Sequence, residues 1–269
     1  MSTLWGAIIK LFIAGFEGGF QKYMIEKSPL FVLGSYFYLR KCNTEYLNYV
    51  KNYAFDFILD SGAFSMLNTN KSLDNFIKDL DKYVNDYIDF INKNDIKHYI
   101  ELDIDSLIGY EEVKKIRTKL EKETNKKCIP VWHLSRGLDE WNKLTKEYDY
   151  IAIGGIVTKE IKKKDYNKLF PALLKIAKKN NCKVHGLGFT SSECQKYEFY
   201  SIDSTSWKSC NRFGNIVIFN KNKMENRIVS KTNRLKSDKE TQEKIYNLSL
   251  QEWIKYQKYL LKGEKIERK

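Results

Sequence analysis

The sequence predicts a closed barrel of eight parallel strands with helical crossovers, the (β/α)8 TIM-barrel class. Short apolar runs recur along residues 1–207, and each is followed by a charged stretch with helical spacing. Strand–helix units in series imply parallel strands. About eight units in this length suit a closed barrel better than an open doubly wound sheet, which is the alternative. The 269 residues and the 42% hydrophobic content allow one large core.

The eight expected strands are short and apolar, with polar residues at their ends. They are Ile8–Ala14, Leu30–Ser35, Phe57–Asp60, Tyr99–Asp103, Ile129–His133, Tyr150–Gly154, Lys183–Gly188 and Tyr200–Asp203. The first belongs to the apolar stretch Leu4–Phe16, which Lys10 interrupts and which is too short to span a bilayer. We therefore expect a buried strand there, and neither a signal peptide nor a membrane span.

Five helices are expected between the strands. The clearest covers Ser72–Asn92, where apolar residues recur at three- and four-residue steps and Ser72 stands at the capping position. The other four are Glu111–Glu123, Leu138–Tyr148, Tyr166–Lys179 and Ser191–Tyr197.

The pattern changes after residue 207. Asn215–Phe219 and Asn226–Ser230 predict a small hairpin, and Asp238–Leu261 predicts one or two basic helices with an apolar side. We expect a catalytic barrel over residues 1–207 and a C-terminal hairpin and basic helical extension over 208–269 that packs on it. A basic flap that contacts phosphates is the alternative role for the extension.

The charge balance is strongly basic. Lys and Arg number 47 against 34 Asp and Glu, so the net charge is +13. That surplus favours a polyanionic partner, nucleic acid before an anionic membrane surface, over a lysine-rich surface that only confers solubility. The five cysteines have no C-x-x-C spacing, which argues against a zinc or redox site and favours reduced thiols in a cytoplasmic protein.

Acidic residues gather where the expected strands end. Asp60 ends the third strand, Asp103 the fourth and Asp203 the eighth. Because the carboxyl ends of barrel strands form one rim, these three side chains can converge on one pocket. Alternation along the fourth strand places Glu101 and Asp103 toward the barrel axis and Ile100 toward the helices.

Clustered carboxylates raise one another's pKa, so one of them can hold a proton near neutral pH. Such a pair suits chemistry at a glycosidic carbon, where one carboxylate attacks the sugar and the other moves protons. Binding of a divalent cation and structural pairing with Lys or Arg are equally weighted alternatives at this point.

Four segments, taken in order, resemble those of the tRNA-guanine transglycosylases. They are Asp60-Ser61-Gly62-Ala63-Phe64, which resembles D-S-G-G-F, Ile153-Gly154-Gly155, which resembles I-G-G, Gly186-Leu187-Gly188, which resembles G-V-G, and the nucleophile strand Ser201-Ile202-Asp203. The match covers roughly residues 56–207. The segments Ser35-Tyr36-Phe37-Tyr38-Leu39 and Asp203-Ser204-Thr205-Ser206-Trp207 resemble those of short phage-encoded members, some of which are associated with 7-deazaguanine modification of DNA.

The resemblance implies a role for each matching residue. Asp203 is the implied nucleophile at the ribosyl C1′, Asp60 the implied general acid/base, and Asp103 the implied reader of the hydrogen-bonding edge of the base. The remaining implied substrate contacts are the stacking ring of Phe64, the polar Ser61, and the backbone at Gly154, Gly155 and Gly186. A flat base needs an aromatic face, in-plane hydrogen bonds and close backbone approach, which fits these residue types.

Three departures from the family pattern matter. Trp132 or His133 stands where the family has a glutamine, and His133 either donates to a base oxygen or is a core histidine. No histidine follows His185, so the family's zinc site is not present, and we expect no metal or cofactor. Ser204-Thr205-Ser206-Trp207 replaces an arginine-containing segment, which puts the tRNA-docking parts in doubt and favours DNA.

The sequence therefore predicts a pentosyltransferase that exchanges guanine for a 7-deazaguanine of the preQ0 or preQ1 type in DNA, in the cytoplasm (that of the host, if phage-encoded), with no membrane partner. A partner protein for choosing the target is an open possibility. Action on tRNA, an N-glycosidase in which water resolves the intermediate, and a non-catalytic binding module are the alternatives. The candidates for phosphate contacts are Arg40, Lys41, Arg136, Lys159, Lys162–Lys164, Lys208 and Arg212. The alternative for each of them is a solvated surface charge.

Overall fold

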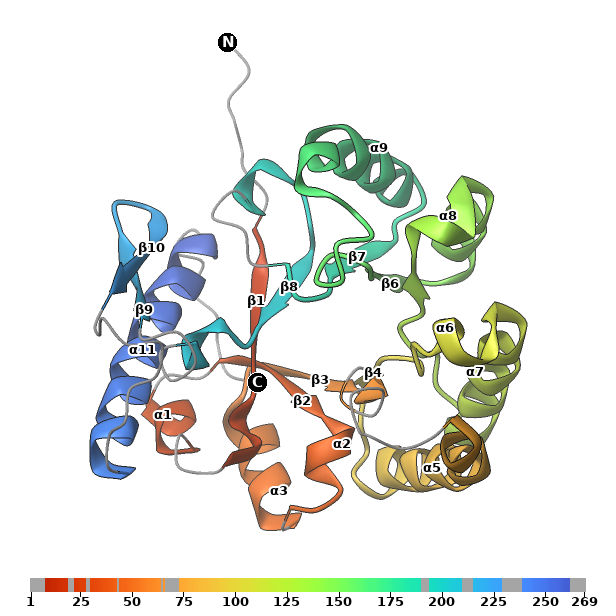
Figure 1. The fold of residues 1–269 in the computed structure, drawn as a ribbon, viewed down its shortest axis with the longest axis horizontal. Helices are drawn as coiled ribbons and strands as arrows, with labels where there is room; N and C mark the ends of the chain where they lie inside the picture. The colour runs from red at the N-terminus through yellow and green to blue at the C-terminus, as the bar shows by residue number, and fades with distance from the viewer. Residues whose placement is uncertain are drawn as a thin grey trace.

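The computed structural model is described for residues 8–18, 22–27, 30–42, 44–63, 65, 73–189, 194–209, 215–228 and 239–261. Over these residues, eight parallel strands lie side by side in the order β4-β3-β2-β1-β8-β7-β6-β5 and curl into a ring (Figure 1). A parallel bridge between Ile100 and Ile129 joins β4 to β5 and completes the ring. The chain is a (β/α)8 barrel, as predicted.

Each strand overlaps the range predicted for it. The bounds are β1 Lys10–Ala14, β2 Phe31–Ser35, β3 Asp56–Asp60, β4 His98–Tyr99, β5 Val131–Trp132, β6 Tyr150–Ile153, β7 Lys183–Gly186 and β8 Ser201–Ser204.

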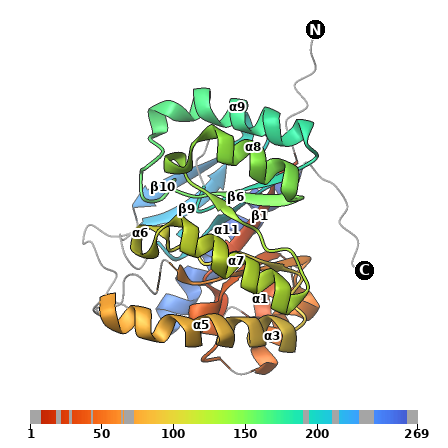
Figure 2. The ribbon, with the colours of Figure 1, turned by 90° about the vertical axis from the view of Figure 1, so that its right-hand side faces the viewer.

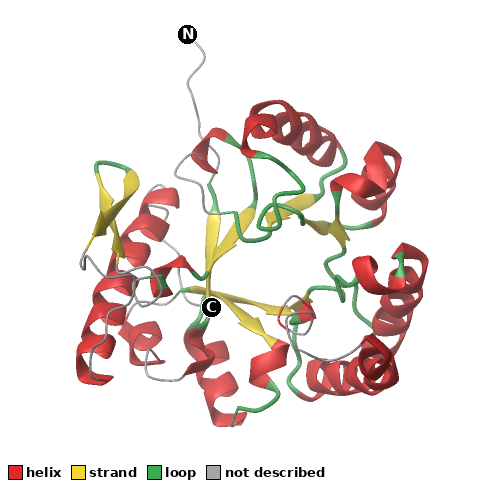
Figure 3. Cartoon of the chain, viewed as in Figure 1, coloured by secondary structure: helices red, strands yellow, loops and turns green. Residues whose placement is uncertain are grey.

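Helices surround the strands (Figure 3). Their bounds are α1 Lys22–Lys27, α2 Tyr36–Leu39, α3 Thr44–Tyr53, α5 Leu73–Lys93, α6 Asp105–Ile108, α7 Tyr110–Thr124, α8 Gly137–Glu147, α9 Tyr166–Lys179 and α11 Lys239–Leu260. The predicted helices are confirmed at α5, α7, α8 and α9, which follow one another around one side of the barrel in Figure 2.

The predicted helix over Ser191–Tyr197 is wrong in its described part, where Cys194–Lys196 form the single 3-10 turn η4. The same connection from β7 to β8 brings Phe189 and Phe199 into the core. The other 3-10 turns are η1 Phe16–Gly18, η2 Leu134–Arg136, η3 Lys163–Asp165 and η5 Ser206–Lys208.

Side chains alternate between the barrel interior and the helix layer. The interior is a packed apolar cluster, as barrels of this class require, and its members are Phe12, Ala14, Phe31, Leu33, Ile58, Ile100, Ile129, Val131, Ala152 and Leu261. Ile151, Ile153 and Ile202 face the helices, as alternation predicted.

The predicted direction of Ile100 is wrong. Ile100 packs in the interior cluster, and Tyr99 points outward, where its hydroxyl donates to the Lys126 carbonyl. β4 ends at Tyr99, so the two-residue period does not continue through Glu101 as it would in a longer strand.

The C-terminal segment shares the core of the barrel. The hairpin of β9 Asn215–Asn220 and β10 Lys223–Ile228 is inserted between β8 and α11. α11 lies against β1, where Gln257 Nε2 donates to the Leu11 carbonyl over 2.7 Å (Figure 1). Its apolar face joins the outward side chains of β1 in one cluster, so α11 takes the place of the helix that follows the eighth strand.

Among the described helices, none combines the length and the apolar composition that crossing a membrane requires.

Packing of α11 can be tested with two leucines of the same helix. Leu250 is fully buried, whereas Leu248 is 56% exposed. We expect Leu250→Ala to lower the free energy of unfolding by about 2–5 kcal/mol, because it leaves a cavity in the core. Leu248→Ala should change it by less than about 0.5 kcal/mol. Urea unfolding followed by circular dichroism measures both changes. Equal losses would show that Leu250 is not packed in the core.

Candidate active site

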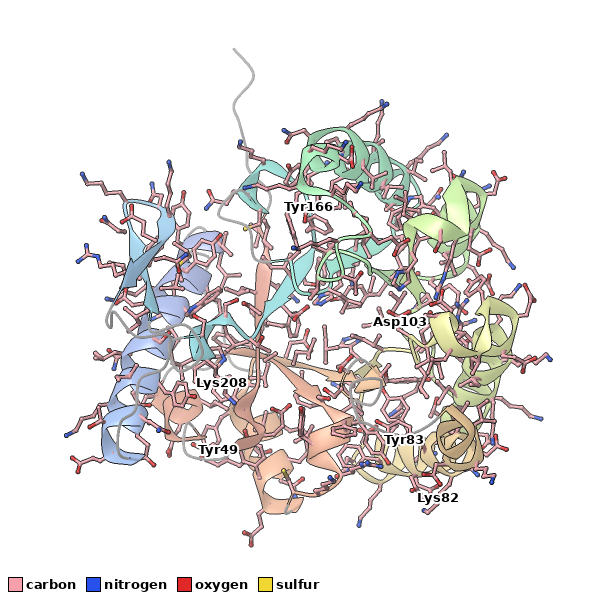
Figure 4. The ribbon with its side chains drawn as sticks, viewed as in Figure 1. Tyr49, Lys82, Tyr83, Asp103, Tyr166 and Lys208 are labelled. Carbon is pink, nitrogen blue, oxygen red and sulfur yellow. The ribbon has the colours of Figure 1, made fainter. Side chains whose placement is uncertain are left out.

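At the carboxyl ends of the strands, the side chains in the barrel interior are polar instead of apolar. Asp60 lies two residues after the interior residue Ile58, and His133 lies two residues after Val131, so alternation carries both inward. Asp203 follows Ser201 on β8 in the same way. Figure 4 shows Asp103 inside the ring, next to α6. The structure thus brings the predicted acidic residues to one mouth of the barrel.

Asp60 is surrounded by protein at the end of β3. Burial raises the pKa of its carboxyl group to about 7, the hydrogen bond from Gly62 N–H opposes that rise, and the charges of Asp203, Glu17 and Asp103 add to it. Its carboxyl group therefore carries a proton for part of the time at neutral pH. The charge effects also show that four acidic side chains share one electrostatic environment.

Two buried hydroxyl groups flank Asp60. Ser35 pairs with Asp60 across β2 and β3, and Ser61 follows it and is 1% exposed. Neither Oγ atom has a hydrogen-bond partner among the described residues. A buried hydroxyl without a partner is unfavourable unless something else supplies one, so these two atoms mark a place where a ligand can bind.

Asp203 is 9% exposed and is held through one oxygen. Gly188 N–H donates to Asp203 Oδ1 over 2.6 Å, and His185 Nε2 lies 3.1 Å from the same atom. Behind it, His185 Nδ1 is 2.6 Å from Ser201 Oγ, which is 2.5 Å from the Tyr150 hydroxyl. With Nε2 protonated, each group in this chain donates to the next, from Tyr150 to Asp203.

His133 lies between two carboxylates. Its Nε2 is 2.8 Å from Asp103 Oδ1, and its Nδ1 is 2.8 Å from Glu160 Oε2. Burial disfavours the charged imidazole, but the bonds to Asp103 and Glu160 outweigh it and raise the pKa of His133 to about 9. His133 is therefore a cation at neutral pH. Because both ring nitrogens are engaged, donation to a base oxygen would require one of these bonds to break.

Gly154 and Gly155, which were predicted as site residues, leave room for His133 and Glu160. A Cβ atom on Gly154 would lie 2.7 Å from the His133 ring. Gly155 has φ +75°, and a Cβ atom there would lie 2.5 Å from Glu160 Oε2. Both positions thus require glycine to seat His133 and Glu160.

Two sequence-based expectations are wrong on this side of the mouth. Arg136, expected at a phosphate, has a side chain only 3% exposed; it donates to Asp105 over 2.8 Å and to the Val131 carbonyl. Glu101, expected to face the axis, is buried against Arg117, whose Nε donates to it over 2.5 Å. Strand alternation predicts neither contact, because Arg117 lies on α7 and Arg136 lies in the 3-10 turn η2.

One group of atoms has a spacing that a divalent cation can use. Ligand atoms of Asp103, Asp105 and His133 lie within 4.8 Å of one another. Arg136 already contacts both carboxylates, and His133 is itself positive. This arrangement favours an ion-pair network over a metal site.

The remaining predicted residues are less central. Phe64 lies outside the described residues. Gly186 turns its Cα hydrogen toward Phe189 and Phe199 in the helix layer, so the structure does not direct it into the mouth. Ser61 belongs to the site through its own hydroxyl and through its carbonyl, which accepts from Tyr83.

Sequence reasoning missed several residues of the site. Glu17 lies in η1 and accepts from Ser35 N–H over 2.8 Å. His185, Glu160 and Gly188 each contact a predicted acidic or basic residue directly. The G-L-G segment was a usable signal for Gly188, because its φ of +64° suits glycine. No local pattern indicated Glu17 or Glu160.

The comparisons with known proteins add little beyond the fold. No protein-family model matches the sequence, and no curated protein matches it. One similar solved structure is a chain of the tryptophan synthase α2β2 complex from the hyperthermophile Pyrococcus furiosus, with 12% identity and a TM-score of 0.44 over 74% of this chain and 86% of that one. At that level the likeness says nothing about function, and the barrel assignment rests on strand order and register.

The charge of His133 can be measured by NMR titration. In the wild type we expect an imidazole pKa of about 9. Glu160→Gln should lower it, because Glu160 stabilises the protonated ring. His98, whose pKa is lowered by burial, serves as the internal control. A His133 pKa near 6.5 that does not respond to Glu160→Gln would contradict the carboxylate–histidine–carboxylate arrangement.

The buried Asp60 carboxyl group predicts a pH-dependent stability. Its pKa is about 7 in the fold and about 4 in an unfolded chain, so ionisation opposes folding increasingly as the pH rises from about 4 to about 7. Asp60→Asn removes this cost and should make the protein more stable than the wild type by about 1–4 kcal/mol at pH 8, with a smaller gain at pH 5.

Urea unfolding at the two pH values measures the difference. Asp81→Asn, an exposed site on α5, is the control with the same charge change. A gain from Asp60→Asn that does not grow with pH would show that the Asp60 pKa is not raised.

Proposed function

We propose that this protein is a transglycosylase that exchanges guanine for a 7-deazaguanine within a polynucleotide, DNA being favoured over tRNA. The observation that carries the proposal is the contrast between two carboxyl groups at one mouth. Asp60 retains a proton near neutral pH because it is buried. Asp203 accepts two donors on Oδ1, and Oδ2 accepts no hydrogen bond among the contacts of the described residues.

Two carboxyl groups in different environments suit displacement at a glycosidic carbon. Asp203 Oδ2 attacks C1′ of the target nucleotide, the bond from C1′ to the base nitrogen breaks, and protonated Asp60 gives its proton to the departing guanine. The sugar is then an ester of Asp203. The incoming 7-deazaguanine attacks C1′, loses its ring proton to Asp60 and releases Asp203, which restores both groups.

The resemblance to tRNA-guanine transglycosylases supports the same roles. Asp60, Asp103 and Asp203 match the acid/base, base-reading and nucleophilic positions of that family. Asp103 contacts His133 over 2.8 Å, and its carboxylate oxygens are acceptors of the kind that the N–H groups on a guanine edge need. The unpartnered hydroxyls of Ser35 and Ser61 beside Asp60 supply further polar contacts for a base.

Base exchange is tested by incubating the protein with DNA, or separately with tRNA, together with isotopically labelled 7-deazaguanines. Mass spectrometry of the nucleosides then identifies the product. A labelled 7-deazaguanosine supports exchange and tells which polynucleotide is used. An abasic site would show that the reaction is hydrolysis and not exchange. If neither product forms with any tested base, the proposal is contradicted.

Asp203→Ala should abolish exchange, with a loss of at least about 10³-fold, because no covalent intermediate can form. The wild type, quenched in denaturant without an incoming base, should carry a covalently attached polynucleotide that migrates with it on a denaturing gel. Asp81→Asn serves as the folded control. Wild-type rates in Asp203→Ala would show that another group is the nucleophile.

A further inference from the structure

Large apolar side chains are exposed mainly at the mouth of the barrel. Eight such side chains are strongly exposed among the described residues, and Ile8 and Leu248 lie elsewhere. The other six follow strands β2 to β6, in the connections or the first turns of the helices: Tyr38, Ile77, Leu107, Leu134, Leu138 and Val157. Because all such connections of a parallel barrel lie at one end, these six form an apolar crown on the same end as Asp60 and Asp203.

Exposed cations stand on two opposite sides of this mouth. Arg40 and Lys41 follow β2, and a lysine loop of Lys159, Lys162, Lys163 and Lys164 follows β6. In the strand order, β2 and β6 are four places apart in a ring of eight, so the two groups face each other across the mouth.

Acidic residues occupy the side between β4 and β5. They are Glu111 and Glu112 in the first turn of α7 and Asp139 and Glu140 in the first turn of α8. Glu111 and Glu112 are paired with Lys114 and Lys115, so this side has no excess of positive charge, and a polyanion is attracted instead along the line from β2 to β6.

Both cationic groups border the candidate active site. The Arg40 guanidinium lies 5.0 Å from the centre of the Tyr83 ring, and the Tyr83 hydroxyl donates to the Ser61 carbonyl, next to Asp60. In the lysine loop, Glu160 contacts His133, and Val157 lies against Gly188, whose N–H holds Asp203. A polynucleotide that is bound along the line from β2 to β6 passes over Asp60 and Asp203.

A second feature on the β2 side is less suited to phosphates. A hollow of about 670 Å³ between α2 and α5 is lined by Arg40, Lys41 and Lys93 but also by Asp86 and Asp89. Because Arg40 and Lys41 are also the cations of the β2 side of the mouth, the two aspartates make that side less positive than the lysine loop, which is the stronger contact for a polyanion.

We propose that a double-stranded polynucleotide crosses the mouth along the β2–β6 line, with its phosphates on Lys41 and the lysine loop. The apolar crown then fills the gap that the extruded target nucleotide leaves. This inference rests on the proposed function for the identity of the extruded nucleotide.

The composition of the crown favours a duplex over a single strand. Five of its six members are aliphatic and one is aromatic. Proteins that bind single strands stack bases on aromatic rings, whereas aliphatic side chains act as wedges between base steps of a duplex. A nucleotide must leave the stack before its C1′ can be reached, and a wedge stabilises the opened duplex.

Binding tests the line across the mouth. The probe is a fluorescent DNA duplex that contains guanine, and its affinity is measured by anisotropy over a range of salt concentrations. K162E/K164E should weaken binding about tenfold or more at about 0.1 M salt and reduce the salt slope by about 2. K41E, on the opposite side, should also weaken binding. K175E/K179E, on exposed lysines near the other end of α9, is the control with the same change of charge.

Equal losses in K162E/K164E and K175E/K179E would overturn the proposal, since net charge alone would then explain binding. Wild-type affinity in K41E would overturn the crossing line. These outcomes involve binding alone, so they decide the docking surface even if the protein exchanges no base.

Exchange on two substrates tests the wedge. L107A/L134A should lower the ratio of the rate on duplex DNA to the rate on the same single strand by about fivefold or more, because only the duplex has to be opened. L248A, an exposed leucine on α11, is the control. Equal losses on both substrates, or a preference of the wild type for the single strand, would overturn the duplex assignment while leaving the proposed exchange reaction intact.

Discussion

Charge balance at the barrel mouth is the constraint on which the site depends. On the side of β4 to β6, four carboxyl groups share three cations: Glu101, Asp103, Asp105 and Glu160 each contact at least one of Arg117, Arg136 and the charged His133. On the side of β1, β3 and β8, the charges that act on Asp60 are those of Asp203, Glu17 and Asp103. One half of the mouth is therefore a fixed ion-pair network, and in the other half a proton on Asp60 relieves the repulsion.

This division separates the residues that are held in fixed ion pairs from the carboxyl group that changes protonation. The paired half is rigid because each buried charge has a partner, and removal of one partner would leave an unpaired charge behind. The other half keeps a carboxyl group that changes protonation near neutral pH, beside a carboxylate held through one oxygen. In the proposed exchange reaction, Asp60 is therefore the group that is placed to gain and lose a proton.

The sequence predicted the barrel and the meeting of Asp60, Asp103 and Asp203 at its mouth because both follow from periodicity. Ile202 and Asp203 obey the two-residue alternation of a strand, and so do Ile151 and Ala152. The prediction for Glu101 was wrong because β4 stops two residues earlier. Arg136, Glu160 and Glu17 act through contacts with residues 5 to 31 positions away in other elements, which no local pattern encodes. His133 is a similar case, because its raised pKa depends on Asp103 and on Glu160, which lie 30 residues before it and 27 residues after it.

The packing of α11 on β1 determines when the barrel can finish folding. Leu11 and Gln257 are 246 positions apart, so a chain growing on the ribosome makes its first strand long before the helix that covers it. Until α11 has emerged, the outward side of β1 remains exposed to solvent, and no helix covers β1 and β8. Since β8 carries Asp203, the surroundings of this carboxylate are complete only after α11 has been made and has packed on β1.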